Sequence, residues 1–200
     1  MQYYFTSDFH LQHKRIIEFS KRPFANVEEM DEAIIKNWNS RITNQDCIYF
    51  LGDFAFSNAA FVAQTIRRLN GRILFIRGNH EQPLEQFFKG IKGYPDIWPR
   101  VEFLGDYKEV TINGQVIILC HYPFLIWNKK HYNSWCLAGH SQYNLPATRK
   151  EATAFGKVLD VGVDGNNFMP YSFDEIVEIM KNKPMMSDFV VIQDHHGSKN

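Results

Sequence analysis

Acidic, amide and imidazole side chains follow short apolar runs at several points along the chain. They are Asp8 and His10 after the first run, Asp53 after Gly52, Asn79 and His80 after Gly78, His121 directly after a run, and His140 after Gly139. Carboxylate, amide and imidazole ligands together suit divalent manganese, iron or zinc better than calcium or magnesium alone. Two such ions about 3.5–4 Å apart can share a hydroxide and hold a phosphoryl group for in-line displacement. These residue types therefore predict a two-metal hydrolytic site.

The runs that precede these side chains have the length and composition of buried strands. We expect strands over Tyr3–Phe5, Cys47–Leu51, Ile73–Ile76, Trp135–Ala138, Val158–Val163 and, near the end of the chain, Phe189–Ile192. Asn113-Gly114 lies between Tyr107–Ile112 and Gln115–Cys120, and Asn-Gly is favoured in two-residue hairpin turns. These two segments are therefore predicted to form a hairpin that leads into His121.

Helices are expected between the strands. The predicted helices are Leu11–Phe19, one that starts at Asn26 with Glu29 as its capping-box partner, one from Ser57 or Asn58 to about Leu69, and one from Ser172, paired with Glu175, to about Met180. Alternating strands and helices favour parallel pairing, and the hairpin makes the sheets mixed. Side chains at the carboxyl ends of such strands meet in one crevice. Asp53 ends the central strand and is expected to bridge the two metals.

The composition is that of a soluble globular protein, and we expect one domain over residues 1–200. Charged residues make up 22% of the chain with a formal net charge of zero, so no extended nucleic-acid surface is evident. Cys47, Cys120 and Cys136 are expected to be free, buried thiols in a reducing compartment. No segment reads as a signal peptide or a membrane span, so we expect a cytoplasmic protein without a membrane partner.

Five short motifs follow one another along the chain in this order: Asp8-x-His10, Gly52-Asp53, Gly78-Asn79-His80, His121 and Gly139-His140. This series resembles that of the calcineurin-like metallophosphoesterase superfamily, and the whole sequence is similar to its small stand-alone bacterial and phage members. The resemblance implies a four-layer α/β/β/α sandwich of two mixed β-sheets.

The resemblance also implies a role for each residue. Asp8 and His10 would hold the first metal, Asp53 would bridge, and Asn79, His121 and His140 would hold the second. His80 would protonate the leaving oxygen as general acid, since an imidazole titrates near neutral pH. Glu81 would orient the His80 ring or support its protonated form.

Two positions need separate comment. Arg77-Gly78-Asn79-His80-Glu81 matches the local motif of the Ser/Thr protein phosphatase branch, in which the arginine grips phosphate, but Phe54-Ala55-Phe56 replaces the Asp-Arg-Gly run of that branch. We therefore expect no protein phosphatase. The superfamily usually has Gly-His-x-His, whereas this chain has Gln142 at the last position. Gln142 offers an amide oxygen, so the first metal would bind weakly, be held partly by water or be lost on purification.

Other polar residues have an ordinary alternative. His13 is expected to be an exposed helix residue, with contact to substrate as the alternative. For His131, in the loop Trp127–Tyr132, a phosphate or base contact and a plain surface position are both left open. Asp164 and Asn166 are expected in a turn, with indirect support of the metal site as the alternative, and His195 and His196 are expected to have no chemical role.

The predicted function is hydrolysis of a phosphate ester, more readily a diester, by a metal-bridged hydroxide. The catalytic residues would be His80, Asp53 and Arg77, and the cofactors two divalent ions of manganese, iron or zinc. A short chain without a large cap domain is expected to leave an open cleft, which suits a nucleotide-like or short nucleic-acid substrate. The alternative is a degenerate metal-site homologue that acts as a protein-binding module, which Gln142 favours and the presence of His80 opposes.

Overall fold

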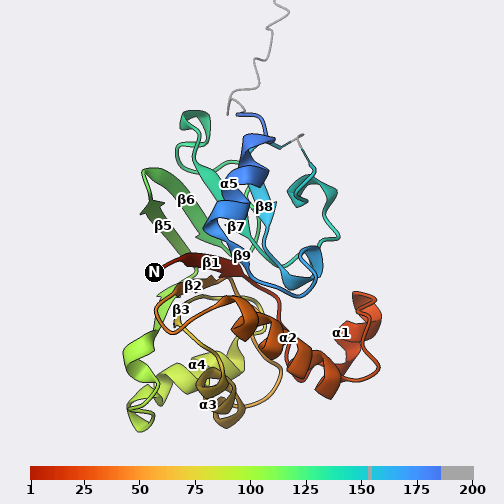
Figure 1. The fold of residues 1–200 in the computed structure, drawn as a ribbon, viewed down its shortest axis with the longest axis vertical. Helices are drawn as coiled ribbons and strands as arrows, with labels where there is room; N and C mark the ends of the chain where they lie inside the picture. The colour runs from red at the N-terminus through yellow and green to blue at the C-terminus, as the bar shows by residue number, and fades with distance from the viewer. Residues whose placement is uncertain (153–154, 186–200) are drawn as a thin grey trace, which may run out of the picture.

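Two β-sheets lie face to face in the computed structural model of this chain, which describes residues 1–152 and 155–185 (Figure 1). The first sheet has the strand order β4-β3-β2-β1-β9, formed by β1 (Tyr3–Thr6), β2 (Cys47–Phe50), β3 (Arg72–Ile76), β4 (Val101–Gly105) and β9 (Tyr171–Ser172). Strands β1 to β4 are parallel, and β9 is antiparallel to β1.

The second sheet has the order β5-β6-β7-β8, formed by β5 (Tyr107–Ile112), β6 (Gln115–Cys120), β7 (Trp135–Ala138) and β8 (Val158–Asp160). The predicted hairpin is confirmed, because β5 and β6 are antiparallel around Asn113-Gly114. Strands β6, β7 and β8 are parallel. Both sheets are therefore mixed, and the predicted α/β fold class with two mixed sheets is confirmed.

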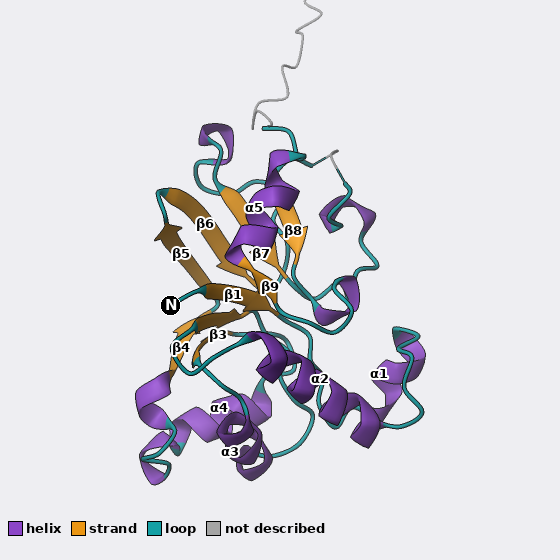
Figure 2. Ribbon diagram, viewed as in Figure 1, coloured by secondary structure: helices purple, strands orange, loops and turns teal. Residues whose placement is uncertain are grey.

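The helices are α1 (Lys14–Phe19), α2 (Val27–Arg41), α3 (Ala59–Arg68), α4 (Gln82–Lys89) and α5 (Phe173–Lys181). Short 3₁₀ turns cover Ile91–Gly93, Trp98–Arg100, Lys130–Tyr132, Pro146–Thr148 and Val163–Gly165. Helices α2, α3 and α4 cover the outer face of the first sheet (Figure 2). Each helix of the described residues is too short or too polar to cross a bilayer.

Side-chain caps begin three of these helices, as the sequence predicted. The Asn26 side chain accepts from the Glu29 amide at the start of α2, and Asn58 accepts from the Phe61 amide at the start of α3. A complete capping box of Ser172 and Glu175 begins α5. The predicted capping box at α2 differs by one residue. The Glu29 carboxylate accepts from the backbone amide of Ala25 and not from that of Asn26.

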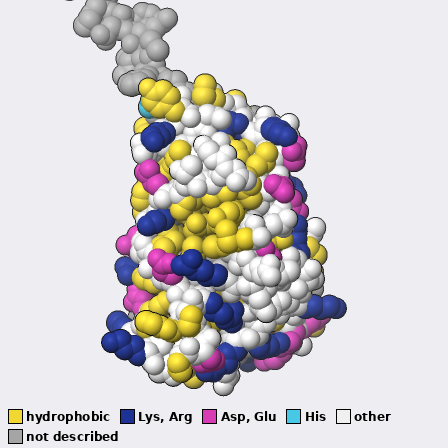
Figure 3. Space-filling view, turned by 60° about the vertical axis from the view of Figure 1, so that its left-hand side comes forward, with side chains coloured by type: hydrophobic (Ala, Val, Ile, Leu, Met, Phe, Trp, Pro, Cys, Tyr) yellow, Lys and Arg dark blue, Asp and Glu magenta, His cyan; other side chains and the backbone are white. Residues whose placement is uncertain are grey.

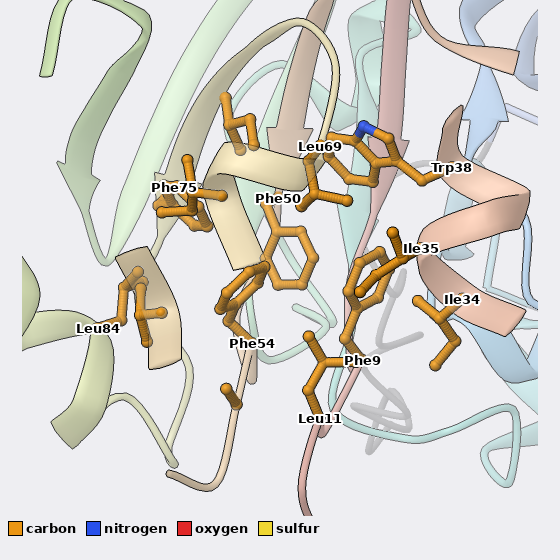
Figure 4. Packing of buried hydrophobic residues seen from close by; sticks show 14 of the residues in the cluster. Phe9, Leu11, Ile34, Ile35, Trp38, Phe50, Phe54, Leu69, Phe75 and Leu84 are labelled. Carbon is orange, nitrogen blue, oxygen red and sulfur yellow. The ribbon is translucent and has the colours of Figure 1, made fainter. Parts of the chain in front are cut away.

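An aromatic core fills the space between the first sheet and its helices (Figure 4). Phe9 lies at its centre with no exposed surface, edge-on to Phe50 at 4.8 Å and to Trp38 at 5.7 Å between ring centroids. Edge-to-face geometry is the favoured arrangement for such rings. Phe9 lies between Asp8 and His10 in the sequence. Its packing in the core therefore fixes the backbone that carries these first two candidate ligands.

A second core lies between the two sheets, and α5 packs into it through Ile176 and Met180. Leu104 on β4 and Val110 on β5, the edge strands of the two sheets, are only partly buried. A patch of apolar side chains reaches the surface on one face of the molecule (Figure 3). The outer face of the second sheet is covered by a third, small cluster that includes the buried Trp127.

Several boundaries differ from those expected. Helix α1 starts at Lys14, because Leu11 forms a bridge with Ala55 and so extends the line of β1. Strand β8 ends at Asp160, before the predicted Val163. No pattern predicted α4, β4 or β9: β4 and β9 are short edge strands of the first sheet, and α4 is a short helix on its outer face. The predicted strand Phe189–Ile192 lies outside the described residues.

Phe9→Ala should lower the free energy of unfolding by about 3–5 kcal/mol, because it leaves a cavity among Trp38, Phe50 and Phe54. Urea denaturation followed by tryptophan fluorescence measures the change. Trp98→Ala is the control, since Trp98 is 56% exposed, and should shift stability by no more than about 0.5 kcal/mol. Equal losses in the two variants would contradict this account of the core.

Candidate metal centre

The candidate ligands come together where strands of both sheets end. Past the last paired residues of β1 and β2, the two chains continue side by side: the Asp8 amide donates to the Gly52 carbonyl at 3.0 Å, and the His10 amide donates to the Asp53 carbonyl at 3.0 Å. The second sheet joins them through His121, whose ring Nδ1–H donates to the Leu51 carbonyl at 2.8 Å. The predicted convergence of the candidate ligands at the ends of the strands is confirmed.

The turns that carry the ligands are backbone-strained. Asp8, His10, Asp53 and His140 have φ of 59°, 52°, 61° and 69°. Non-glycine residues rarely adopt this left-handed region, and each such residue costs free energy that the surrounding structure must offset. Strain gathered at one point of the fold marks that point as a functional site.

Two groups of ligand atoms share one carboxylate. Asp8, His10 and Asp53 form the first group, and Asp53, His121 and His140 form the second; within each group the ligand atoms lie within 4.8 Å of one another. The Asp53 Oδ2 atom is 3.5 Å from His10 Nε2 and 3.6 Å from His121 Nε2. The Asp53 carboxylate therefore lies where a ligand that bridges two metal ions would lie.

The atoms that face one another here are mostly acceptors. Because His121 Nδ1 carries the proton donated to Leu51, the lone pair of its Nε2 faces Asn79 Oδ1 at 2.8 Å. His140 Nδ1 lies 2.9 Å from the same oxygen. The buried Asp53 Oδ2 has no hydrogen-bond partner among the described residues. A divalent cation is bound by acceptor atoms that point to one place and have no donor between them. The side chains here meet that requirement, so they could hold metal ions.

The protonation states suit ligands. Burial alone would raise the pKa of Asp8, but the hydrogen bond to His10 and the nearby His121 bring it below its ordinary value. Asp8 is therefore ionised at neutral pH. Burial and the neighbouring His121 lower the pKa of His140, which favours the neutral imidazole that binds metals.

Glycine is required at two of the turns. Gly52 has φ of +94°, and a Cβ there would lie 2.6 Å from both the Gly78 Cα and His121 Nδ1. A Cβ on Gly139 would lie 2.5 Å from Asp8 Oδ2. Only glycine allows the chain to approach the ligands this closely.

The sequence matches the family model for calcineurin-like phosphoesterases over residues 1–199. The chain belongs to the calcineurin-like phosphoesterase family. It is 32% identical over 180 residues to the uncharacterized protein MJ1445 of Methanocaldococcus jannaschii, covering 89% of this chain and 90% of that protein. It is also 32% identical over 132 residues to the gene 66 protein of Mycobacterium phage L5, covering 61% of this chain and 63% of that protein.

Among solved structures, the protein AQ665 from Aquifex aeolicus has the same fold, with a TM-score of 0.66 and 24% sequence identity. The match covers 89% of this chain and 98% of that one. The resemblance drawn from the five motifs is thus confirmed at the level of the family and of the fold.

In this family member, a cavity of about 440 Å³ opens over the ligand groups. The described residues that line it are His10, His13, Ile16, Phe19, Asp53, Phe56, Asn79, His80, His140 and Gln142. Gln142 Nε2 lies 3.1 Å from His10 Nε2, which places the Gln142 amide at the first ligand group. His80 is exposed in the cavity, and its backbone amide donates to Asp53 Oδ1 at 2.9 Å.

His13 departs from its expected position. It is half-buried, lies directly before α1 and stacks on Phe56 with 4.0 Å between ring centroids. Burial, together with His10 and His80, lowers its pKa to about 4, so the ring is neutral at neutral pH. The expectation of an exposed helix histidine is wrong, and His13 faces the cavity.

Arg77 and His131 are not among the residues that line the cavity. The Arg77 guanidinium pairs with Glu85 at 3.0 Å and with Asp106 at 3.3 Å, and it lies over the Phe103 ring. These contacts hold it against α4, so the structure gives no support to a phosphate-gripping Arg77. His131 is exposed and contacts the Tyr132 ring. His195 and His196 lie outside the described residues.

Glu81 is a buried support of the bridging residue. Its Oε1 accepts from the backbone amides of Asp53 and Phe54, the latter at 3.3 Å. Burial and the nearby Asp53 raise the Glu81 pKa to about 8. The expectation that Glu81 orients the His80 ring is wrong: its side chain turns inward and holds the Asp53 turn.

Arg22 is a second support, which no sequence motif predicted. Its guanidinium has no exposed surface and donates to the Asp8 carbonyl at 2.7 Å and to the Phe9 carbonyl at 2.8 Å. It also forms a two-bond pair with Asp164, at 2.9 and 2.8 Å. Asp164 does lie in a turn as predicted, but its carboxylate anchors Arg22.

Asp160 supports the turn that follows His140. Its carboxylate accepts from the Ser141 hydroxyl, from the Tyr143 amide at 3.1 Å and from the Gly162 amide at 2.7 Å. Burial and the nearby Asp8 raise its pKa to about 6. The last residue of β8 thereby positions the loop that carries His140 and Gln142.

Arg22→Met should weaken metal binding by the group Asp8, His10 and Asp53 by about 10–100-fold, because the carbonyls that fix this turn lose their donor. It should also lower the free energy of unfolding by about 3–5 kcal/mol, since Asp164 is left buried and unpaired. Manganese titration followed by electron paramagnetic resonance resolves the two metal steps. Arg22→Lys, which keeps the charge, should lie between wild type and Arg22→Met.

The matched control is Arg41→Met. Arg41 pairs with Glu175 at 2.7 Å, but the two side chains are 24% and 42% exposed, so the loss should be no more than about 1 kcal/mol. Metal affinity should not change. An unchanged first metal step in Arg22→Met would show that Arg22 stabilises the fold without shaping the site.

Proposed function

We propose that this phosphoesterase hydrolyses phosphodiesters with the help of two divalent metal ions held at the centre described above. The observation that carries the proposal is the shared position of Asp53, whose partnerless Oδ2 faces ligand nitrogens of both groups. Asp8, His10 and Asp53 would hold one ion, with Gln142 beside them. Asp53, Asn79, His121 and His140 would hold the other.

Bound ions would supply a nucleophile by lowering the pKa of water, and would draw charge from the phosphoryl group. The chain provides the remaining parts. Asp53 ties the two groups together, Glu81 and Arg22 hold the strained turns, and His80 stands in the cavity outside both ligand groups. A histidine so placed can donate a proton to the leaving oxygen, which supports its role as general acid.

A diester fits the charge of the cleft better than a monoester. Neither Lys nor Arg is among the described residues that line the cavity. A monoester carries a second negative charge near neutral pH, and that charge would find no cationic side chain. A diester carries one charge, which the metal ions would balance. We propose manganese as the metal for assay, since the mixed ligand set suits it.

The alternative function is a protein-binding module whose metal site no longer supports catalysis. Gln142 is the one sequence feature that favours it. The amide at this position faces the His10 ring and would have to rotate to offer its oxygen. A cytoplasmic location stays a prediction. It agrees with three cysteines that are free and buried, Cys47, Cys120 and Cys136.

His80→Ala should lower kcat for a dialkyl phosphodiester with manganese by about 10²–10⁴-fold, because an alkoxide leaving group needs a proton donor. Cleavage of bis-p-nitrophenyl phosphate should fall much less, since nitrophenolate leaves without a proton. Metal content by elemental analysis should stay at the wild-type value. The wild-type enzyme should cleave bis-p-nitrophenyl phosphate faster than p-nitrophenyl phosphate. His131→Ala serves as the control. If wild type cleaves neither ester and holds less than one metal per chain, the binding-module alternative holds.

Gln142→His should tighten the first metal by about tenfold or more, because imidazole is a better ligand than an amide for these ions. Activity at low manganese should rise with it. Isothermal titration with manganese measures the change, with Asn144→His, an exposed position nearby, as the control. An unchanged affinity would mean that position 142 does not reach the metal.

A further inference from the structure

A second cavity adjoins the metal centre. It has a volume of about 470 Å³ and is lined by Ala55, Phe56, Ser57, Asn79, His80, Gln82 and Pro83. Phe56, Asn79 and His80 also line the cavity over the ligand groups. The second cavity therefore opens directly onto the cavity of the metal centre. The volume is within the range of small-molecule sites.

The described residues that line this cavity include no Lys, Arg, Asp or Glu. Its polar groups are the Ser57 hydroxyl and the amides of Asn79 and Gln82, with the His80 ring at the shared edge. Within residues 1–152 and 155–185, Ser57 and Gln82 are exposed and their side chains make no hydrogen bond. They are thus available to a ligand that offers both donors and acceptors, as the edge of a nucleobase does.

Phe56 gives the cavity a flat apolar side. It is 38% exposed, and its ring is braced by the His13 ring at 4.0 Å and 12° and by the His80 ring at 4.6 Å and 48°. A braced ring loses little conformational freedom when a planar ligand packs on it. Phe56 belongs to the Phe54-Ala55-Phe56 run, the point at which this sequence departs from the protein phosphatase branch.

We propose that this second cavity is a nucleoside subsite: it takes the base of a nucleotide ester whose phosphate lies at the metal centre. The inference rests on the proposed phosphodiesterase function and names its substrate class. Phe56 packs against the base, and Gln82 and Ser57 bind the base edge. Neither Lys nor Arg is among the described residues that line the two cavities, so a second phosphate would find no cationic side chain. The substrate is a mononucleotide ester and not a nucleic-acid strand.

The test uses two diesters with the same leaving group. Methyl 4-nitrophenyl phosphate and thymidine 5′-(4-nitrophenyl phosphate) both release nitrophenolate, and they differ only in the nucleoside. With manganese-loaded enzyme, kcat/KM for the thymidine ester should exceed that for the methyl ester by about tenfold or more, since a base stacked on an aromatic ring contributes about that factor. Phe56→Ala and Gln82→Ala should each reduce this ratio.

Phe124→Ala is the matched control, because Phe124 is 40% exposed, close to the value for Phe56, but lines a separate groove with Pro123 and Leu125. It should keep the wild-type ratio. A wild-type ratio near one, or a ratio that Phe56→Ala leaves unchanged, overturns the subsite. Faster cleavage of a single-stranded oligonucleotide than of the thymidine ester would overturn the restriction to mononucleotides.

Equilibrium binding separates failure of the subsite from failure of the proposed function. Thymidine 5′-monophosphate and inorganic phosphate are titrated into manganese-loaded protein. The nucleotide should bind about tenfold more tightly, and Phe56→Ala should remove that advantage while the affinity for phosphate stays. If neither diester is cleaved but this pattern appears, the function is wrong and the subsite stands. If nucleotide and phosphate bind equally, the subsite is wrong.

Discussion

The position of Asp53 is the constraint on which the rest of the structure depends. Strand β2 lies in the middle of the first sheet, and Asp53 follows it at the edge where the second sheet also ends. Its carboxylate must face ligands from both sheets, so the sheets must meet at this edge. The hydrogen bond from His121 to the Leu51 carbonyl sets that meeting, because it joins the end of β6 to the end of β2.

Holding such a carboxylate in place is costly. Four ligand residues adopt left-handed backbone conformations, and several charged groups lose contact with water. Buried polar groups of this kind are tolerated only where hydrogen bonds replace the lost water. Glu81, Arg22 and Asp160 make those bonds, each to the backbone of a turn that carries a ligand. The site is thus supported by a layer of buried hydrogen-bonding side chains, and the aromatic core around Phe9 supports that layer in turn.

Cationic side chains near the centre face the protein and not the substrate. Arg22 is buried behind Asp8, and Arg77 is engaged with Glu85 and Asp106. Neither guanidinium is among the groups that line the cavity over the candidate ligands. In the proposed function, metal ions would bind the phosphate of the substrate, and aromatic and amide groups would bind the rest. This arrangement would favour an ester with one negative charge and a planar neutral substituent.

Sequence patterns alone predicted which residues could bind metal and that strand ends would bring them together. Asp8, Asp53, Asn79, His121 and His140 each follow an apolar run, and parallel strands bring their carboxyl ends to one edge whatever the details of packing. The hairpin and the helix caps were equally local, since Asn-Gly and Ser172 with Glu175 act within a few residues. Short marginal elements such as β4 and α4 carried no such local signal.

Only the tertiary structure decided what surrounds the ligands. Arg22 and Asp164 are 142 residues apart, and no spacing rule connects them. The direction of a side chain was also beyond the sequence: Glu81 follows His80 yet turns to Asp53, and Arg77 precedes Gly78 yet turns to α4. A motif specifies which residue types are present at a turn. Long-range packing and charge pairing select the rotamer, and the rotamer decides whether a side chain faces the substrate or the protein interior.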